Sequence, residues 1–215
     1  GHVGKPVISY NTTVTMRQRP RYSDRSVNVM NSKERIQFSR DLTALHYEYP
    51  KNMTIIGYEY WLQKLYSKEI SQTEFDMQIA KLETTNTDWF DLLTEDSFSH
   101  NHTLSLSGGS ETARYYASLG YTRDNDVIKG DHNERYTANL NLNLASWLTA
   151  SFGLTGNVSG RAYYQEELAP MQYAYRTSRA IPAFDDNGEY FYYKKKADDV
   201  LLNTFFNYNI LNELD

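Results

Sequence analysis

Histidines are the residues of this sequence best suited to bind a metal or to transfer protons near neutral pH. His46, His100, His102 and His132 form no H-E-x-x-H motif or related ligand spacing. His100 and His102 are two residues apart, so on a strand they share one face, where a place at the rim of a sheet explains them better than a metal site. The 215 residues contain no Cys, which excludes thiolate nucleophiles, disulfides and Cys-ligated zinc within them. We therefore predict no catalytic residue, no metal site and no cofactor.

Three carboxylates, those of Asp124, Asp126 and Asp131, are spaced somewhat like the ligands of a calcium-binding loop. Such a loop ends on a Glu that binds the ion through both oxygens, and it needs a Gly at its sharp turn. Arg135 stands where that Glu should be, and the turn Gly is missing. These residues are therefore predicted to lie in a solvated loop.

Arg161, Tyr163 and Tyr164 are the residues most suited to contact a substrate. A tyrosine ring offers a stacking surface and a guanidinium donates hydrogen bonds, which suits a sugar or a peptide. Aromatic residues just beyond the end of a strand also form the girdle that membrane proteins place at the interface with water. The sequence is compatible with both roles, contact with a substrate and a place in the girdle.

The elements that must position these residues are dominated by one alternating stretch, residues 136–158. Apolar and small polar residues take every second place on both sides of a turn at residues 145–147, which predicts an antiparallel hairpin. The predicted register puts one set of side chains on a common face and the asparagines on the other: Leu140, Leu142, Leu144, Leu148, Ala150 and Phe152, against Asn139, Asn141 and Asn143.

No Lys, Arg, Asp or Glu occurs from Thr137 to Ser159. A face turned to bulk water usually carries charge, whereas small uncharged side chains suit a crowded, wet lumen and an apolar face suits lipid. A nine-residue strand is about 30 Å long and, tilted by about 40°, covers roughly 23 Å of the ~25 Å apolar band of an outer-membrane barrel. The hairpin therefore favours a transmembrane barrel, although a soluble sandwich shares its periodicity.

Further strands are predicted at residues 7–16, from Phe98, and at residues 115–121 after a tight turn. Helical periodicity fills residues 27–96, where Ser71 and Glu74 form a capping box. The aromatic residues of this helical part are predicted to form its small core: Tyr58, Tyr60, Trp61 and Trp89. Short connections at 108–112 and 145–147 alternate with long ones at 18–97, 122–135 and from 159 onward, as in an up-and-down barrel.

Several separated segments now match a known family in the same order: GKPVISYN at 4–11, NTDW at 86–89, HTLSLSGGS at 102–110, RYYASLGY at 114–121, IKG at 128–130, RY at 135–136 and NYNILN at 207–212. They resemble the SusC/RagA family of TonB-linked outer-membrane transporters of Bacteroidetes. The resemblance implies import of oligosaccharides or peptides across the outer membrane, together with a SusD-like surface lipoprotein.

The fold class expected from pattern and resemblance is mainly β: antiparallel up-and-down strands of a partial transmembrane β-barrel with an α-helical outer-loop insert. The expected division is a first barrel strand at 1–17, the helical outer-loop insert at 18–97, antiparallel barrel strands at 98–158, and an outer loop with the start of further strands at 159–215. The chain opens Gly1-His2-Val3 and is expected to be part of a longer protein. Contact with TonB would then run through a plug region absent from these residues.

The net charge of -5 gives no basic footprint for nucleic acid, so the expected partners are the lipoprotein, membrane lipid and the solute. The alternative is a soluble, secreted β-rich glycan-binding module or adhesin. Isolated from their barrel, the 215 residues are predicted to self-associate, because two sheet edges and an apolar face would be left open.

Overall fold

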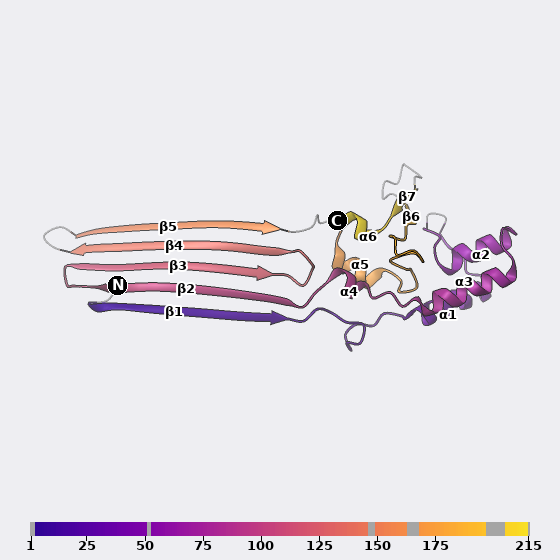
Figure 1. Ribbon diagram of the computed structural model, residues 1–215, viewed down its shortest axis with the longest axis horizontal. Helices are drawn as coiled ribbons and strands as arrows, with labels where there is room; N and C mark the ends of the chain where they lie inside the picture. The colour runs from indigo at the N-terminus through magenta and orange to yellow at the C-terminus, as the bar shows by residue number, and fades with distance from the viewer. Residues whose placement is uncertain (1–2, 51–52, 146–148, 163–167, 197–204, 215) are drawn as a thin grey trace. The chain divides into compact units, whose positions relative to one another are not determined.

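The computed structural model describes residues 3–50, 53–145, 149–162, 168–196 and 205–214 (Figure 1). The chain divides into two compact units. The first unit combines Gly1–Arg19 with Thr94–Tyr164, and the second combines Pro20–Leu93 with Gln165–Asp215. Each unit therefore contains segments that are far apart in the sequence, and each is described separately below.

The first unit is a single five-stranded sheet of β1 (Gly4–Arg17), β2 (Ser97–Gly109), β3 (Ala113–Asn125), β4 (His132–Ala145) and β5 (Thr149–Ala162). Figure 1 shows the strands side by side in chain order, and each is antiparallel to its neighbours. Strands of 13 or 14 residues are more than twice the usual length of about 5 to 6 residues. The predicted up-and-down order is confirmed, and within the described residues β1 and β5 remain the two edges of an unclosed sheet.

The register of the predicted hairpin, formed by β4 and β5, is the one predicted. Leu140 pairs with Leu154 and Leu142 with Phe152, while Asn141 pairs with Gly153. Directly opposed residues of an antiparallel pair share a face, so the apolar and polar positions of β4 and β5 stay in phase along the whole ladder. Leu148, which was assigned to the same face, lies outside the described residues.

The long connection predicted at 122–135 is wrong, because the strands continue through most of it. Thr122 pairs with Arg135 and Arg123 with Glu134, and only residues 126–131 form the turn. An ion pair between Arg123 Nη1 and Glu134 Oε1 at 2.9 Å joins the two strands there. The ends of these strands carry charged side chains, which are also typical of a loop. The sequence pattern therefore did not indicate that the strands continue.

The second unit begins with three helices, α1 (Ser32–Ala44), α2 (Tyr58–Tyr66) and α3 (Gln72–Thr85). A full capping box starts α1, where Asn31 and Glu34 each accept the other's backbone N–H. One of the two hydrogen bonds of the capping box predicted for α3 is present, since the Ser71 hydroxyl accepts the Glu74 N–H at 3.2 Å. The three helices enclose one core: Ile36, Tyr58, Phe75, Ile79 and Leu82, joined by Ala180.

The rest of the second unit comes from both halves of its sequence. It comprises α4 (Trp89–Leu93), α5 (Pro170–Arg176), β6 (Tyr193–Lys196), β7 (Phe205–Tyr208) and α6 (Ile210–Leu214). Their shared core buries Trp89 and Phe90 with the C-terminal residues Ala174, Tyr208 and Ile210. None of the helices in the described residues is long and apolar enough to cross a membrane.

The aromatic residues expected in one small helical core are distributed differently. Tyr58 is buried in the core of α1 to α3, and Trp61 packs against that core. Trp89 is buried in the second core instead, and the assignment of Tyr60 to a core is wrong because its side chain is 41% exposed. Tyr60 lies outside the i, i+3, i+4, i+7 spacing that starts at Tyr58, and its ring meets that of Trp61 edge to face.

Candidate functional site: a two-faced sheet

One face of the five-stranded sheet is apolar and open. The register places β2, β3, β4 and β5 leucines in adjoining rows on this face: Leu104, Leu106, Leu119, Leu140, Leu142 and Leu154. Leu119 is 62% exposed and Leu154 58%. Because burying one such side chain is worth about 1.5 to 3 kcal/mol, a continuous patch of this kind is unfavourable in water and suits hydrocarbon.

The opposite face is polar but carries little charge. Its side chains bond to one another, with Asn101 Nδ2 donating to Thr122 Oγ1 at 2.7 Å and Asn139 Nδ2 donating to Ser118 Oγ at 3.3 Å. Gly120 leaves room for the opposed Thr137, whose Oγ1 lies 2.5 Å from where a Cβ on Gly120 would be. Short, uncharged and mutually bonded side chains fit the crowded interior of a barrel.

A row of aromatic rings crosses the strands at one end of the apolar face. His102, Tyr121 and Tyr136 are directly opposed on neighbouring strands, with 4.8 Å between the centroids of the two tyrosine rings. The Tyr10 hydroxyl lies 2.6 Å from His102 Nδ1, and the Arg123–Glu134 ion pair follows one row further out. The change from aliphatic to aromatic to charged residues is typical of a membrane–water interface.

His100 lies beside this row, to which His102 belongs. His100 and His102 share a face, as expected, and their ring centroids are 5.1 Å apart. His100 also packs beside Tyr121 at 5.6 Å. Among the described residues there is no group of three or more side chains able to hold a metal ion.

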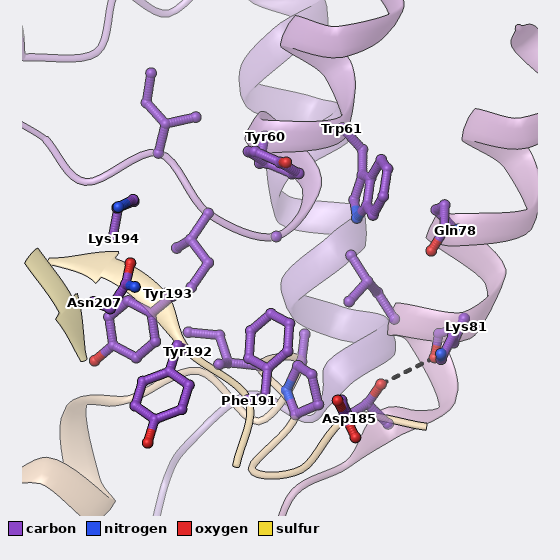
Figure 2. A pocket seen from close by; sticks show the side chains of 18 of the residues that line it. Tyr60, Trp61, Gln78, Lys81, Asp185, Phe191, Tyr192, Tyr193, Lys194 and Asn207 are labelled. Atoms are coloured by element: carbon purple, nitrogen blue, oxygen red, sulfur yellow. Dashed lines mark hydrogen bonds between the residues drawn. The ribbon is translucent and has the colours of Figure 1, made fainter. Parts of the chain in front are cut away.

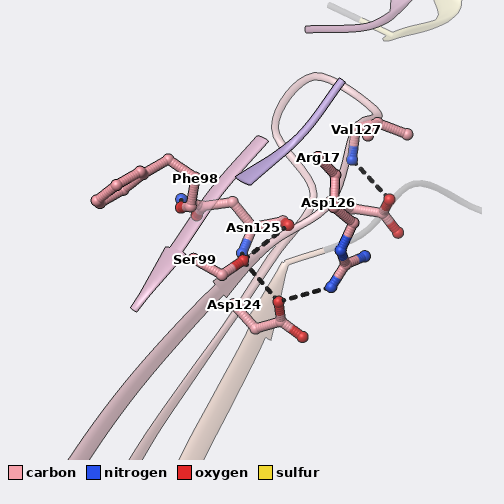
Figure 3. Close-up of polar contacts among 7 residues, drawn as sticks. All are labelled: Arg17, Phe98, Ser99, Asp124, Asn125, Asp126 and Val127. Carbon is pink, nitrogen blue, oxygen red and sulfur yellow. Dashed lines mark hydrogen bonds and ion pairs between the residues drawn. The ribbon is translucent and has the colours of Figure 1, made fainter. Parts of the chain in front are cut away.

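Polar contacts join the first three strands at the same end of the sheet (Figure 3). Asp124 Oδ1 accepts from Ser99 Oγ at 2.7 Å and from Arg17 Nη2 at 3.1 Å. The Ser99 hydroxyl in turn accepts the Asn125 N–H at 3.0 Å. Asp124 therefore lies in β3 and connects it to β1 and β2, and the prediction of a loop position for it is wrong; Asp126 does lie in the turn.

Of the residues assigned to substrate contact, Arg161 lies near the end of β5, opposite Asn133. It lines a small polar hollow of about 230 Å³ with Arg17, Asp124 and Asp126. Tyr163 and Tyr164 lie outside the described residues. The role of these three residues in substrate contact therefore stays a prediction.

Part of this sequence is similar to the sequences of known outer-membrane receptors. No protein-family model matches the chain. The TonB-dependent receptor SusC of Bacteroides thetaiotaomicron is 43% identical over 63 residues, which are 29% of this chain and 6% of that receptor. The TonB-dependent receptor P26 of Formosa agariphila is 30% identical over 107 residues, 49% of this chain and 10% of the receptor.

Solved structures supply the matching fold. The RagAB peptide importer in its closed-closed state matches with a TM-score of 0.56 and 21% identity, over 89% of this chain and 22% of that one. The chain is similar in sequence to parts of two TonB-dependent receptors and in fold to part of RagAB. The RagAB peptide importer in its open-open state gives a TM-score of 0.55 over the same shares. The mainly β, antiparallel fold and the outer-membrane location expected for a SusC/RagA-like segment agree with these likenesses.

Proposed function

We propose that this chain supplies wall strands and outer-loop structure to a TonB-dependent outer-membrane transporter. The transporter imports oligosaccharides or peptides together with a SusD-like surface lipoprotein, and it performs no chemistry on them. The named relatives are receptors and an importer rather than enzymes, which supports this reading. The chain spans about a tenth or less of the curated relatives that it matches.

The observation that carries the proposal is the two-faced sheet. Leu140 and Leu154 are opposed on the face that exposes its leucines, and Asn139 bonds to Ser118 on the face that contains little charge. A barrel wall between hydrocarbon and a wet interior uses an open apolar face and a polar face of low charge at once. A soluble glycan-binding module or adhesin would have to cover the leucines.

The parts of the chain take different places in this proposal. Residues 1–17 and 98–158 form barrel wall, residues 18–97 form the helical outer-loop insert, and residues 159–215 form a further outer loop with following strands. The two compact units support a division into wall and outer structure. Lipid contacts the leucine face, the lipoprotein contacts the outer structure, and TonB contacts a plug region outside these residues.

Uptake by cells that produce the full-length protein tests the proposal. Labelled oligosaccharides and peptides are offered to matched strains with and without TonB, and the protein is purified under mild conditions to identify companions. We expect accumulation of at least one solute that needs TonB, and co-purification of a lipoprotein. Accumulation that is equal in both strains, or a protein recovered from the soluble fraction, would contradict the proposal.

A further inference from the structure

A pocket of about 710 Å³ lies within the second unit, between the helices α2 and α3 and the segment that leads into β6 (Figure 2). Leu82, Ala180 and Ile181 lie along it, and these residues belong to the two cores of the unit. The volume falls within the ~300 to 1,000 Å³ typical of small-molecule sites. Because the pocket adjoins both cores, its walls are held by residues that are already packed.

Aromatic rings line opposite walls of the pocket. Figure 2 shows Tyr60 and Trp61 on the α2 side and Phe191, Tyr192 and Tyr193 on the other. Trp61 and Tyr60 meet edge to face with 5.2 Å between ring centroids. The Tyr192 hydroxyl donates to Asn212 Oδ1 at 3.0 Å, which fixes its ring. Rings held in place before a ligand arrives lose little conformational entropy on binding.

The rings of Tyr60 and Tyr192 belong to neither hydrophobic core of the unit. Tyr60 is 41% exposed and Tyr192 44%, and both lie outside the two clusters of core residues. Phe184 and Phe205, which also line the pocket, are exposed to a similar extent. Four large aromatic side chains left open around one hollow are better explained by a ligand than by the folding of the unit.

The polar groups of the pocket favour a neutral ligand. Three side-chain amides line it, those of Gln63, Gln78 and Asn207, and none of the three side chains meets a hydrogen-bond partner within the described part of the chain. The charges of its four ionic side chains cancel: Lys81, Lys194, Asp185 and Asp186. Lys81 Nζ lies 2.5 Å from Asp186 Oδ1, and Asp185 Oδ1 accepts two backbone N–H groups of its own turn.

We infer that this pocket binds a neutral oligosaccharide. A pyranose ring presents C–H groups on its faces and hydroxyls around its edge, so its face stacks on an aromatic ring and its edge bonds to amides, which donate and accept. Tyr60 and Tyr192 supply the stacking surfaces, and Gln78 and Asn207 supply the amides. The role of the site depends on the proposed function: it would hold the solute at the outer part of the transporter.

Calorimetric titration of the full-length protein in detergent tests the inference. The probes are maltotetraose, cellotetraose, laminaritetraose and mannotetraose, with tetragalacturonate and tetra-alanine as an acidic saccharide and a peptide. We expect at least one neutral tetrasaccharide to bind. Tyr192→Ala and Gln78→Ala should each weaken that binding by about tenfold or more, which is 1.4 kcal/mol.

Tyr66→Ala is the matched control, because Tyr66 is a 70% exposed aromatic residue of α2 that does not line the pocket; its affinity should equal that of the wild type. Tyr192→Phe keeps the ring and should retain most of the binding. The far-UV circular dichroism spectrum and the melting temperature of every variant should equal those of the wild type, which establishes that the protein is folded.

Failure of all four neutral saccharides to bind would overturn the inference. So would tighter binding of tetragalacturonate or tetra-alanine, or binding that folded Tyr192→Ala and Gln78→Ala leave unchanged. TonB-dependent uptake is measured separately. TonB-dependent uptake without saccharide binding at the pocket would refute this inference alone. Saccharide binding without TonB-dependent uptake would refute the proposed transport function and would support the binding site.

Discussion

An arginine at Leu140 should destabilise the sheet in a way that depends on depth in the membrane. Leu140 lies four residues along β4 from Tyr136, which belongs to the aromatic row. Four residues span about 13 Å of strand, and a tilt of about 40° reduces this to a depth of roughly 10 Å. Leu140 therefore lies close to the middle of an apolar band about 25 Å tall.

A cation at that depth costs about 2 to 4 kcal/mol, which lowers the folding equilibrium constant roughly 30- to 800-fold. Two matched variants carry the same cation elsewhere. Asn141→Arg places it on the polar face, and Val158→Arg places it in the row of Tyr136, with which Val158 is paired. The cost at Val158 should be about 0 to 1 kcal/mol.

Guanidinium unfolding of the full-length protein in phospholipid vesicles measures these differences. The account predicts that Leu140→Arg loses the most free energy of unfolding and that Asn141→Arg and Val158→Arg lose much less. Equal losses at Leu140 and Asn141 would refute the assignment of faces. A large loss at Val158 with little at Leu140 would refute the position of the membrane boundary.

Four further outcomes are expected. Ser71→Ala removes the cap of α3 and should cost about 0.5 to 2 kcal/mol, measured as a loss of helical ellipticity on heating; an unchanged melting curve would count against the cap. Asp124→Asn weakens a half-exposed ion pair with Arg17 and should cost at most about 1 kcal/mol, by chemical unfolding. Burial raises the pKa of Tyr22 and of Tyr208 to about 12, so the folded state holds more protons than the unfolded chain between pH 10 and 12 and loses stability as the pH rises through that window; phenolate absorbance of both residues appearing near pH 10 in the folded protein would contradict this. The isolated 215 residues should self-associate without detergent because of the open leucine face, and light scattering from a detergent-free monomer would oppose that expectation.

Local pattern was sufficient to predict the sheet where every side chain obeyed the period of two. The leucines and asparagines of β4 predicted both the pairing and the register with β5, since a slip of one residue would exchange the faces. The cap of α3 was equally local, because Ser71 and Glu74 are three residues apart. Such signals need no knowledge of the rest of the fold.

Features that depend on distant contacts were not predicted. Arg123 and Glu134 look like loop residues until the two strands are paired and the charges meet. The joint burial of Trp89 with Tyr208, and the pocket between α3 and the segment before β6, bring together residues far apart in the chain. No local period in either segment indicates the other, so only the tertiary structure shows them together.

The central claim is that this sheet stands between lipid and a wet interior. Spin labels placed one at a time at residues 139–142 of β4 in the full-length, lipid-embedded protein test it most directly, and the absence of Cys from these 215 residues removes competing labels from the sheet. The account predicts collisions with oxygen, which concentrates in lipid, at positions 140 and 142, and collisions with a water-soluble nickel chelate at 139 and 141. Equal exposure of all four positions to the nickel chelate, or the reverse alternation, would contradict the account.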